Sequence, residues 1–441
     1  MSPRFGASAL RSRHRDRLRH TSTILTVYFY LDYETPTQMS ELRRELGLLE
    51  AVVYGTGLIL GAGIYAILGE ATGVTGGSIV ISFLLAALIA SVTGLSYAEL
   101  ASLFPKAEGD YIYVRNAFDR EIVSDVTALG RLLMGVISSA AVALAFSGYL
   151  SAFIDVSQIW TAILIVVIMT GINFWGIDLS TKINILFTGI EVAGLVIIIW
   201  IGSGSWGSAE VLHTPNGVVG VLHASFLIFF AYLGFGSIVN LSEETEDATV
   251  TIPRAIILSL GFTTLIYLLV GLSAVSLVDW RVLGQSASPL AAVARVGWGT
   301  RGSTLLGAIA LFSTTNTVLI LQISTSRLLY GVSKSEYHVF PEIFSRVHSS
   351  RQTPHYAVML VGIVTIPFVF LGDIGFVAGL ANLMLLVVFV LVNAALLKLR
   401  YSRPEQERGF RAPLNVGQLS ITAVAGLISS LGLIAFYILT W

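Results

Sequence analysis

Long apolar runs, separated by short polar connectors, dominate the sequence. The hydrocarbon core of a membrane is about 30 Å thick, so a helix that crosses it needs roughly 20 mostly apolar residues. A transmembrane β-barrel would show short segments of alternating polarity instead. The pattern therefore predicts an all-α integral membrane protein with about eleven transmembrane helices, over Leu48–Ala71, Ser78–Phe104, Val123–Phe153, Ile159–Gly176, Ile183–Ile201, Val218–Asn240, Ala255–Val278, Ser303–Tyr330, Tyr356–Leu371, Ile374–Leu397 and Val416–Trp441.

The composition excludes several other classes of protein. Charged residues make up 12% of the chain, against roughly 25% in an average soluble protein, and cannot cover a water-exposed surface. The sequence has no cysteine, which excludes a thiolate metal site and a cysteine nucleophile. Its net charge of -1 gives no general attraction to nucleic acid, and it contains no phosphate-binding Gly-x-x-x-x-Gly-Lys-[Ser/Thr] loop. We therefore expect no enzymatic activity and no cofactor, with membrane lipid as the main partner.

Lys and Arg are distributed unevenly between alternate connectors. With the N-terminus inside, sixteen of them lie in cytoplasmic connectors and three lie outside, at Arg281, Arg295 and Arg301. Because positively charged loops resist translocation, this asymmetry predicts a multi-pass protein of the cell membrane with a cytoplasmic N-terminus. An odd number of spans then places Trp441 outside.

Residues 1–46 are expected to form an N-terminal cytoplasmic tail. Residues 1–38 are rich in Arg and Ser, and their apolar patch, Ile24–Leu31, is too short to span a membrane. A targeting segment, a disordered basic tail and a translation start at Met39 remain open as explanations. The last two together are favoured, because Met39 leads directly into the first span.

Two glycine-rich runs, Gly55–Ile64 and Phe229–Gly236, interrupt the first and sixth spans. At about 1.5 Å per residue, Gly61 lies about 20 Å from the start of its helix and Gly234 about 24 Å from the start of its own, so both runs lie at membrane depth. Glycine weakens a helix by about 1 kcal/mol relative to alanine and makes local unwinding easy. Unwound backbone at this depth must line a cavity or be buried in protein. Close helix packing through small residues is the alternative explanation.

The positions of the two runs favour a binding site. They open two groups of five spans that enter the membrane from opposite faces, which predicts an inverted repeat over residues 47–203 and 204–399, followed by a cytoplasmic loop and a last helix over 400–441. Interrupted helices at equivalent places in such halves indicate the binding site of a transporter. The positive end of a half-helix suits a carboxylate and free carbonyl groups suit an ammonium group, so the expected ligand is a zwitterion.

Further motifs accompany the two glycine-rich runs. The whole set is Gly61–Tyr65, Gly69–Ala71, Tyr97–Leu100, Phe104–Pro105, Gly109–Tyr113, Ser147–Leu150, Phe229–Phe235, Glu243–Thr245 and Ile252–Ile256. Together they resemble the amino acid-polyamine-organocation superfamily, and the first two spans are most similar to its cationic amino acid transporter-like branch. The resemblance implies a LeuT-type fold of five plus five helices with discontinuous helices 1 and 6. It also implies a secondary active transporter that moves amino acids or related amines by alternating access.

The same resemblance implies where the substrate binds. The backbone of the first span would bind the substrate carboxylate. The sixth span would supply the carbonyl groups that bind the substrate amino group, and also a hydrophobic gate. By matching position, these residues are Ile59, Gly61, Ala62, Gly63, Phe230, Ala231 and Leu233. The chain departs from the superfamily at Gly236, where many members have aspartate, and it shows eleven spans instead of twelve.

Glu191 lies about 12 Å along the fifth span, where a charge costs roughly 2.5–3.5 kcal/mol on insertion scales. We expect it to couple transport to an ion, most simply as a proton carrier, although some proton-coupled members of the superfamily have lysine there. Thr314 and Thr315 match positions where Na⁺-coupled relatives place hydroxyl ligands, so they could form a Na⁺ site with carbonyl groups of the first span and Glu191. An ionised Glu191 could instead attract a cationic substrate. Two structural alternatives remain: a protonated Glu191 that bonds a neighbouring helix, and threonines that bond their own helix backbone.

Several functions and roles stay open at this point. Na⁺ symport and amino acid exchange are alternatives within the same fold, and a channel and a membrane amino acid sensor are alternatives from other classes. A channel would require a repeated filter or a charged ring, and the sequence shows neither. Arg131 and Asn316 are expected to serve helix packing or hydrogen bonds between helices. Glu99 and Arg327, near the cytoplasmic helix ends, are candidates for an inner gate or for interfacial ion pairs.

Overall fold

The structure, a computed structural model, describes residues 46–106, 109–118, 120–176, 181–208, 210–334, 340–349, 351 and 353–440, with the backbone alone for 181–186. The expectations for residues 1–38 and for Trp441 fall outside this part of the chain. The described residues belong to one unit. Their regular elements are helices and one two-stranded antiparallel hairpin.

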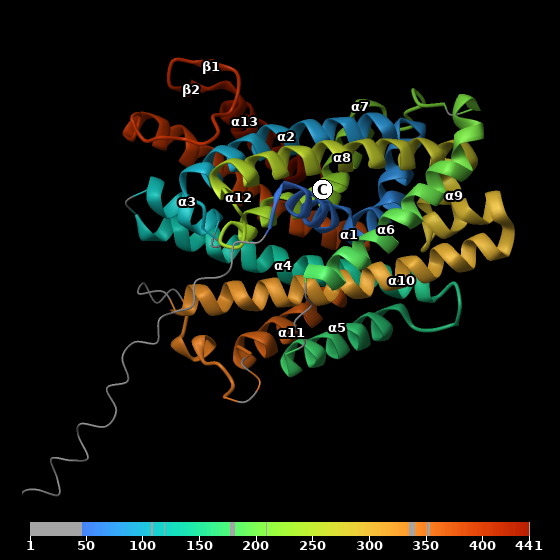
Figure 1. Cartoon of the computed structure of the whole chain (residues 1–441). Helices are drawn as coiled ribbons and strands as arrows, with labels where there is room; N and C mark the ends of the chain where they lie inside the picture. Colours follow the sequence, from blue (N-terminus) through green and yellow to red (C-terminus); the bar gives the residue numbers. More distant parts are fainter. Residues whose placement is uncertain are drawn as a thin grey trace, which may run out of the picture. The chain divides into compact units, whose positions relative to one another are not determined.

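Figure 1 shows these helices and the hairpin. In chain order, the elements are α1 Leu48–Thr75, η1 Gly76–Ser78, α2 Ile79–Leu103, α3 Asp110–Ala117, α4 Glu121–Leu150, α5 Gln158–Trp175, α6 Thr181–Gly202, η2 Ser203–Ser208, α7 Gly217–Ile228, η3 Phe229–Leu241, α8 Ala248–Leu277, α9 Trp280–Gly284, α10 Pro289–Lys334, η4 Glu342–Ser345, α11 His355–Val369, α12 Ile374–Ser402, β1 Asn415–Val416, β2 Leu419–Ser420 and α13 Ile421–Thr440.

The predicted all-α membrane fold is confirmed. Among the described residues, nine segments are long and apolar enough to cross a membrane. One of them, Leu48–Leu103, holds both α1 and α2, which the short η1 turn joins. The helix α11 is apolar but has only 15 residues, and so falls below that length. The predicted count of eleven exceeds nine for two reasons: two predicted spans lie in the single segment Leu48–Leu103, and α11 is too short to be counted.

The helix α1 packs against α6, α7, η3, α8, α9 and α10. Its apolar residues from Ile59 to Leu68 are almost fully buried by these neighbours. Large apolar side chains stay exposed on other helices, among them Trp160, Leu164 and Trp200. Exposed apolar surface of this extent suits contact with lipid, whereas a soluble monomer rarely carries it.

Both predicted helix interruptions are present. The backbone of α1 is non-helical at Gly61 (φ -24°, ψ -159°), and α7 ends at Ile228 and continues from Phe229 as the 3₁₀ helix η3. A third interruption lies in α10 at Gly299, whose φ of 63° favours glycine. The first two interruptions lie in the helices that open the two halves of the predicted inverted repeat. The repeat boundaries at residues 203 and 399 stay a prediction.

Candidate functional site

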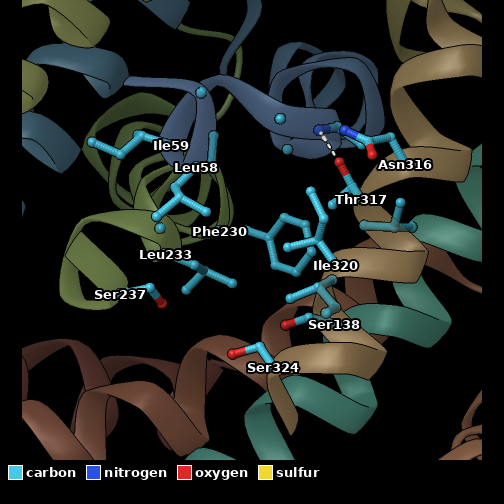
Figure 2. Close-up of a pocket in the computed structure, with 18 of the residues that line it drawn as sticks. Leu58, Ile59, Ser138, Phe230, Leu233, Ser237, Asn316, Thr317, Ile320 and Ser324 are labelled. Atoms are coloured by element: carbon cyan, nitrogen blue, oxygen red, sulfur yellow. Dashed lines mark hydrogen bonds between the residues drawn. The ribbon is translucent and has the colours of Figure 1, made fainter. Parts of the chain in front are cut away.

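A cavity of about 150 Å³ lies beside the interruptions of α1 and η3 (Figure 2). Its walls come from α1, η3, α4, α6 and α10. The residues expected to bind substrate all line it, namely Ile59, Gly61, Ala62, Gly63, Phe230, Ala231 and Leu233. We refer to Ile59–Gly63 and Phe230–Leu233 together as the clamp. The structure thus brings the two glycine-rich runs to one site, while substrate binding there stays a prediction.

Side chains from α8 and α10 hydrogen-bond the backbone of the clamp. The Tyr267 hydroxyl lies 2.8 Å from the Ile59 carbonyl oxygen and 3.0 Å from the Ala231 carbonyl oxygen, so it links the two halves. The Ala62 N–H donates to Thr317 Oγ1 at 3.0 Å, the bond drawn as a dashed line in Figure 2. Backbone groups that leave a helix inside a membrane need such partners. These two side chains therefore stabilise the shape of the clamp.

Two glycines allow α1 and η3 to approach each other closely. A Cβ atom at Gly63 would lie 2.7 Å from Ala231 Cα, and one at Gly234 would overlap the Leu58 carbonyl group. Gly61 has more room, because a Cβ atom there would meet one threonine side chain, at 3.1 Å. Close packing and cavity lining, which the sequence left as alternatives, are thus both roles of these glycines.

Glu191 of α6 lines the cavity and is 2% exposed. Its polar neighbours are Ser313 and Asn316 of α10. Asn316 also lines the cavity, and its buried Oδ1 atom accepts no hydrogen bond from the described residues. The contact with Glu191 is a polar contact between helices, as expected for Asn316, and the position of Asn316 on the cavity wall is an addition to that expectation. The Glu191 carboxyl group and the Asn316 amide together form a polar patch in a mostly apolar wall.

Of the two alternatives for Thr314 and Thr315, the structure shows the hydrogen bond to the helix's own backbone for Thr314, and it places neither threonine at this polar patch. The Thr314 hydroxyl is 2.7 Å from the Ala310 carbonyl oxygen and 3.1 Å from the Leu311 carbonyl oxygen, which means that it bonds its own helix. Neither threonine lines the cavity. Successive residues of a helix are roughly 100° apart around its axis. Because residues 313, 316 and 317 of α10 face α1 and α6, residues 314 and 315 face away from them.

Sequence reasoning missed the walls that α4 and α10 contribute. Their lining residues recur three or four positions apart, on one face of each helix. They are Met134, Ser138 and Val142 on α4, and Asn316, Thr317, Ile320, Leu321 and Ser324 on α10. This periodicity is present in the sequence, but a helix that is apolar on all sides gives no indication of which face meets a cavity.

A layer of buried tyrosines lies at one end of the cavity. The Tyr65 hydroxyl donates to the Glu191 carbonyl oxygen, and the Tyr149 hydroxyl donates to the Tyr65 carbonyl oxygen, each at 3.1 Å. In the opposite direction, the lining continues along α1 to Tyr54 and along η3 to Asn240. The cavity thus extends toward the helix ends that the Lys and Arg asymmetry assigns to the cytoplasm.

A buried ion cluster joins α2, α12 and the loop that follows α12. Glu99 and Arg400 are both fully buried and form a salt bridge. Arg408 Nε lies 3.1 Å from Glu99 Oε1, and the Ala412 N–H donates to Glu99 Oε2 at 2.8 Å. The predicted ion pair at Glu99 is confirmed. Because the carboxylate has several donors, its burial is compensated by hydrogen bonds as well as by charge.

Arg131 of α4 lies close to the cytoplasmic part of the cavity. Its Nε atom pairs with Asp110 Oδ2 at 2.8 Å, and its Nη2 atom lies 3.4 Å from Ser237 Oγ. Ser237 itself lines the cavity. Arg131 thus joins α4 to α3 and η3, as expected of a residue that bonds neighbouring helices, and one of these contacts reaches the cavity wall.

Comparison with known proteins gives consistent matches over most of the chain. A family model described as amino acid permease matches residues 46–440. An uncharacterized transporter of Mycobacterium tuberculosis is 31% identical over 371 residues, which cover 81% of each chain. The branched-chain amino acid permease BcaP of Bacillus subtilis is 25% identical over 398 residues, 84% of each chain. A chloroplastic cationic amino acid transporter of Arabidopsis thaliana is 26% identical over 415 residues, 87% of this chain and 70% of the relative.

Proposed function

Since the chain belongs to the amino acid permease family, we propose that it is a secondary active transporter that moves amino acids across the cell membrane by alternating access, with its N-terminus in the cytoplasm. The observation that carries the proposal is the cavity of about 150 Å³ beside two interrupted helices, in a bundle of membrane-length helices. A site of this kind is typical of transporters that expose one site alternately to either side of the membrane. Relatives named for branched-chain and for cationic amino acids support this substrate class.

In the proposed complex, the clamp binds both charged groups of an amino acid. The second part of α1 begins after Gly61, so the positive end of its dipole and the N–H groups that follow Ala62 suit the carboxylate. The Ala62 N–H itself donates to Thr317 Oγ1. The helix α7 ends at Ile228, so its last carbonyl groups and those of η3 suit the ammonium group. Binding and release require no covalent step.

We further propose that Glu191 couples transport to a proton. A buried carboxyl group in apolar surroundings is neutral more readily than charged, because the carboxylate loses its hydration. Water that enters the cavity from one side would favour the charged form and release the proton there. A Na⁺ site formed by Glu191, Ser313 and Asn316 is the second candidate, because the unpartnered Asn316 Oδ1 is an oxygen ligand of the kind that hard cations prefer.

Uptake into proteoliposomes by the purified Glu191→Gln variant tests the coupling. Glutamine resembles the protonated carboxyl group, so loss of a proton carrier should preserve substrate binding and abolish accumulation driven by a pH gradient. Loss of a Na⁺ site should instead abolish stimulation by Na⁺. Thr314→Val is the matched control and should transport normally, because Thr314 bonds its own helix.

Three results would contradict the proposal. Unchanged pH and Na⁺ dependence in Glu191→Gln would show that Glu191 is structural. Wild-type flux that neither saturates nor responds to a gradient would indicate a channel. Binding of amino acids without any flux would indicate a sensor.

A further inference from the structure

We infer that the substrate is a neutral amino acid with a compact apolar side chain, of the size of valine or leucine. The inference rests on the proposed function and narrows its substrate class. It follows from three properties of the cavity, namely its volume, the chemistry of the wall that α4 and α10 form, and the position of Glu191 on a third helix, α6.

The volume of the cavity, about 150 Å³, limits the size of the substrate. An apolar protein cavity of about 150 Å³ holds one benzene molecule. The isopropyl and isobutyl side chains of valine and leucine are smaller than benzene, while the backbone part of each amino acid would lie against the open backbone of the clamp. Tryptophan and arginine are much larger, so they would require the helices around the cavity to move apart.

The wall that faces the clamp is mostly apolar. Met134 and Val142 project from α4, and Ile320 and Leu321 project from α10. Figure 2 shows Ile320 next to the ring of Phe230, with both side chains directed into the open space of the site. An amino acid whose charged groups bind the clamp would therefore direct its side chain into a pocket lined mainly by methyl and methylene groups, with the Ser138 and Ser324 side chains also on its wall. Such a pocket stabilises aliphatic side chains through burial.

Charged side chains would find no suitable partner in this pocket. Within the described part of the chain, the lining contains no Lys, Arg, His or Asp, and Glu191 is its single carboxyl group. Glu191 is carried by α6, whereas the lining residues of α4 and of its neighbour α10 include no carboxyl group. A lysine side chain against α4 would be desolvated and unpaired, and a glutamate side chain would meet Arg131, which Asp110 already holds in an ion pair. Both arrangements are unfavourable.

Uptake of individually labelled leucine, valine, alanine, phenylalanine, lysine and glutamate into proteoliposomes tests the inference. One methylene group in an apolar pocket changes discrimination by roughly 10- to 200-fold. Leucine should therefore exceed alanine in kcat/KM by at least about tenfold, and uptake of lysine and glutamate should not exceed that of empty liposomes. Uptake of lysine or glutamate at the rate of leucine would overturn the inference and leave the proposed function intact. Uptake of none of the six would overturn the proposed function itself.

A variant of the apolar wall provides an independent readout. Ile320→Ala enlarges the pocket beside Phe230 and should raise the preference for phenylalanine over leucine by at least about tenfold. The matched control is Leu305→Ala on the same helix, because Leu305 is exposed on the surface of α10 and does not line the cavity. If Ile320→Ala does not fold, Ile320→Val should change the preference in the same direction to a smaller extent. An unchanged preference in a folded Ile320 variant would overturn the assignment of the side-chain pocket.

Discussion

The hydroxyl group of Tyr267 links the two halves of the clamp, and Tyr267→Phe removes this group while it keeps the ring. The hydroxyl oxygen lies 2.8 Å from the Ile59 carbonyl oxygen and 3.0 Å from the Ala231 carbonyl oxygen. A single O–H proton serves both acceptors, so its loss corresponds to about one hydrogen bond, roughly 0.5–1.5 kcal/mol net. The cost rises to about 1–3 kcal/mol when a buried acceptor is left without a partner. We therefore expect Tyr267→Phe to unfold at a lower temperature.

The same substitution should weaken substrate binding. Both carbonyl groups belong to clamp residues beside the helix interruptions, so the lost bond affects the order of the clamp more than that of the regular helices. If only about a tenth of the protein molecules keep an ordered clamp, the apparent Kd for the substrate rises about tenfold. This corresponds to a loss of about 1.4 kcal/mol in binding free energy. Calorimetric titration with leucine and thermal unfolding in the same detergent measure the two effects.

Tyr113→Phe is the matched control for this experiment. Tyr113 of α3 is fully buried, but its hydroxyl group has no hydrogen-bond partner among the described residues. Its removal should leave leucine binding unchanged and should not lower the unfolding temperature. A Tyr267→Phe variant with wild-type unfolding temperature and Kd, or equal effects of both substitutions, would refute the role of the shared hydroxyl group.

Three further predictions concern the clamp, the buried ion cluster and the topology. Gly63→Val should abolish leucine binding in protein that still folds, because even its Cβ atom would lie 2.7 Å from Ala231 Cα; near-normal affinity by calorimetry would contradict this. Glu99→Gln should lower the free energy of unfolding by about 3–5 kcal/mol, because it leaves Arg400 buried without its anionic partner; an unchanged unfolding temperature would show that the cluster does not stabilise the fold. Reporter fusions should place Gln406 in the cytoplasm and the C-terminus outside; reporters on the same side would refute the predicted topology.

The sequence by itself determined the membrane architecture and the location of the site. Apolar runs of this length have few folding options, because a chain in lipid must satisfy every backbone hydrogen bond internally. The glycine-rich runs around Gly61 and Gly234 weaken the helix at membrane depth, where unwound backbone must line a cavity or be buried in protein. The sequence alone therefore indicates a cavity at these two runs. The resemblance to known transporters then assigned the clamp residues that the structure brings to the cavity.

Only the tertiary structure decided which polar and apolar side chains complete the site. Thr314 and Thr317 are both threonines on one apolar helix, yet Thr314 bonds its own backbone and Thr317 bonds the clamp. Tyr267 and the partners of Glu99 likewise come from distant helices, whose mutual contacts have no signature in sequence spacing. The physical reason is that lipid-facing and protein-facing surfaces of a membrane helix are both apolar, so the rotation of each helix is set by packing against its neighbours and cannot be read from its own pattern.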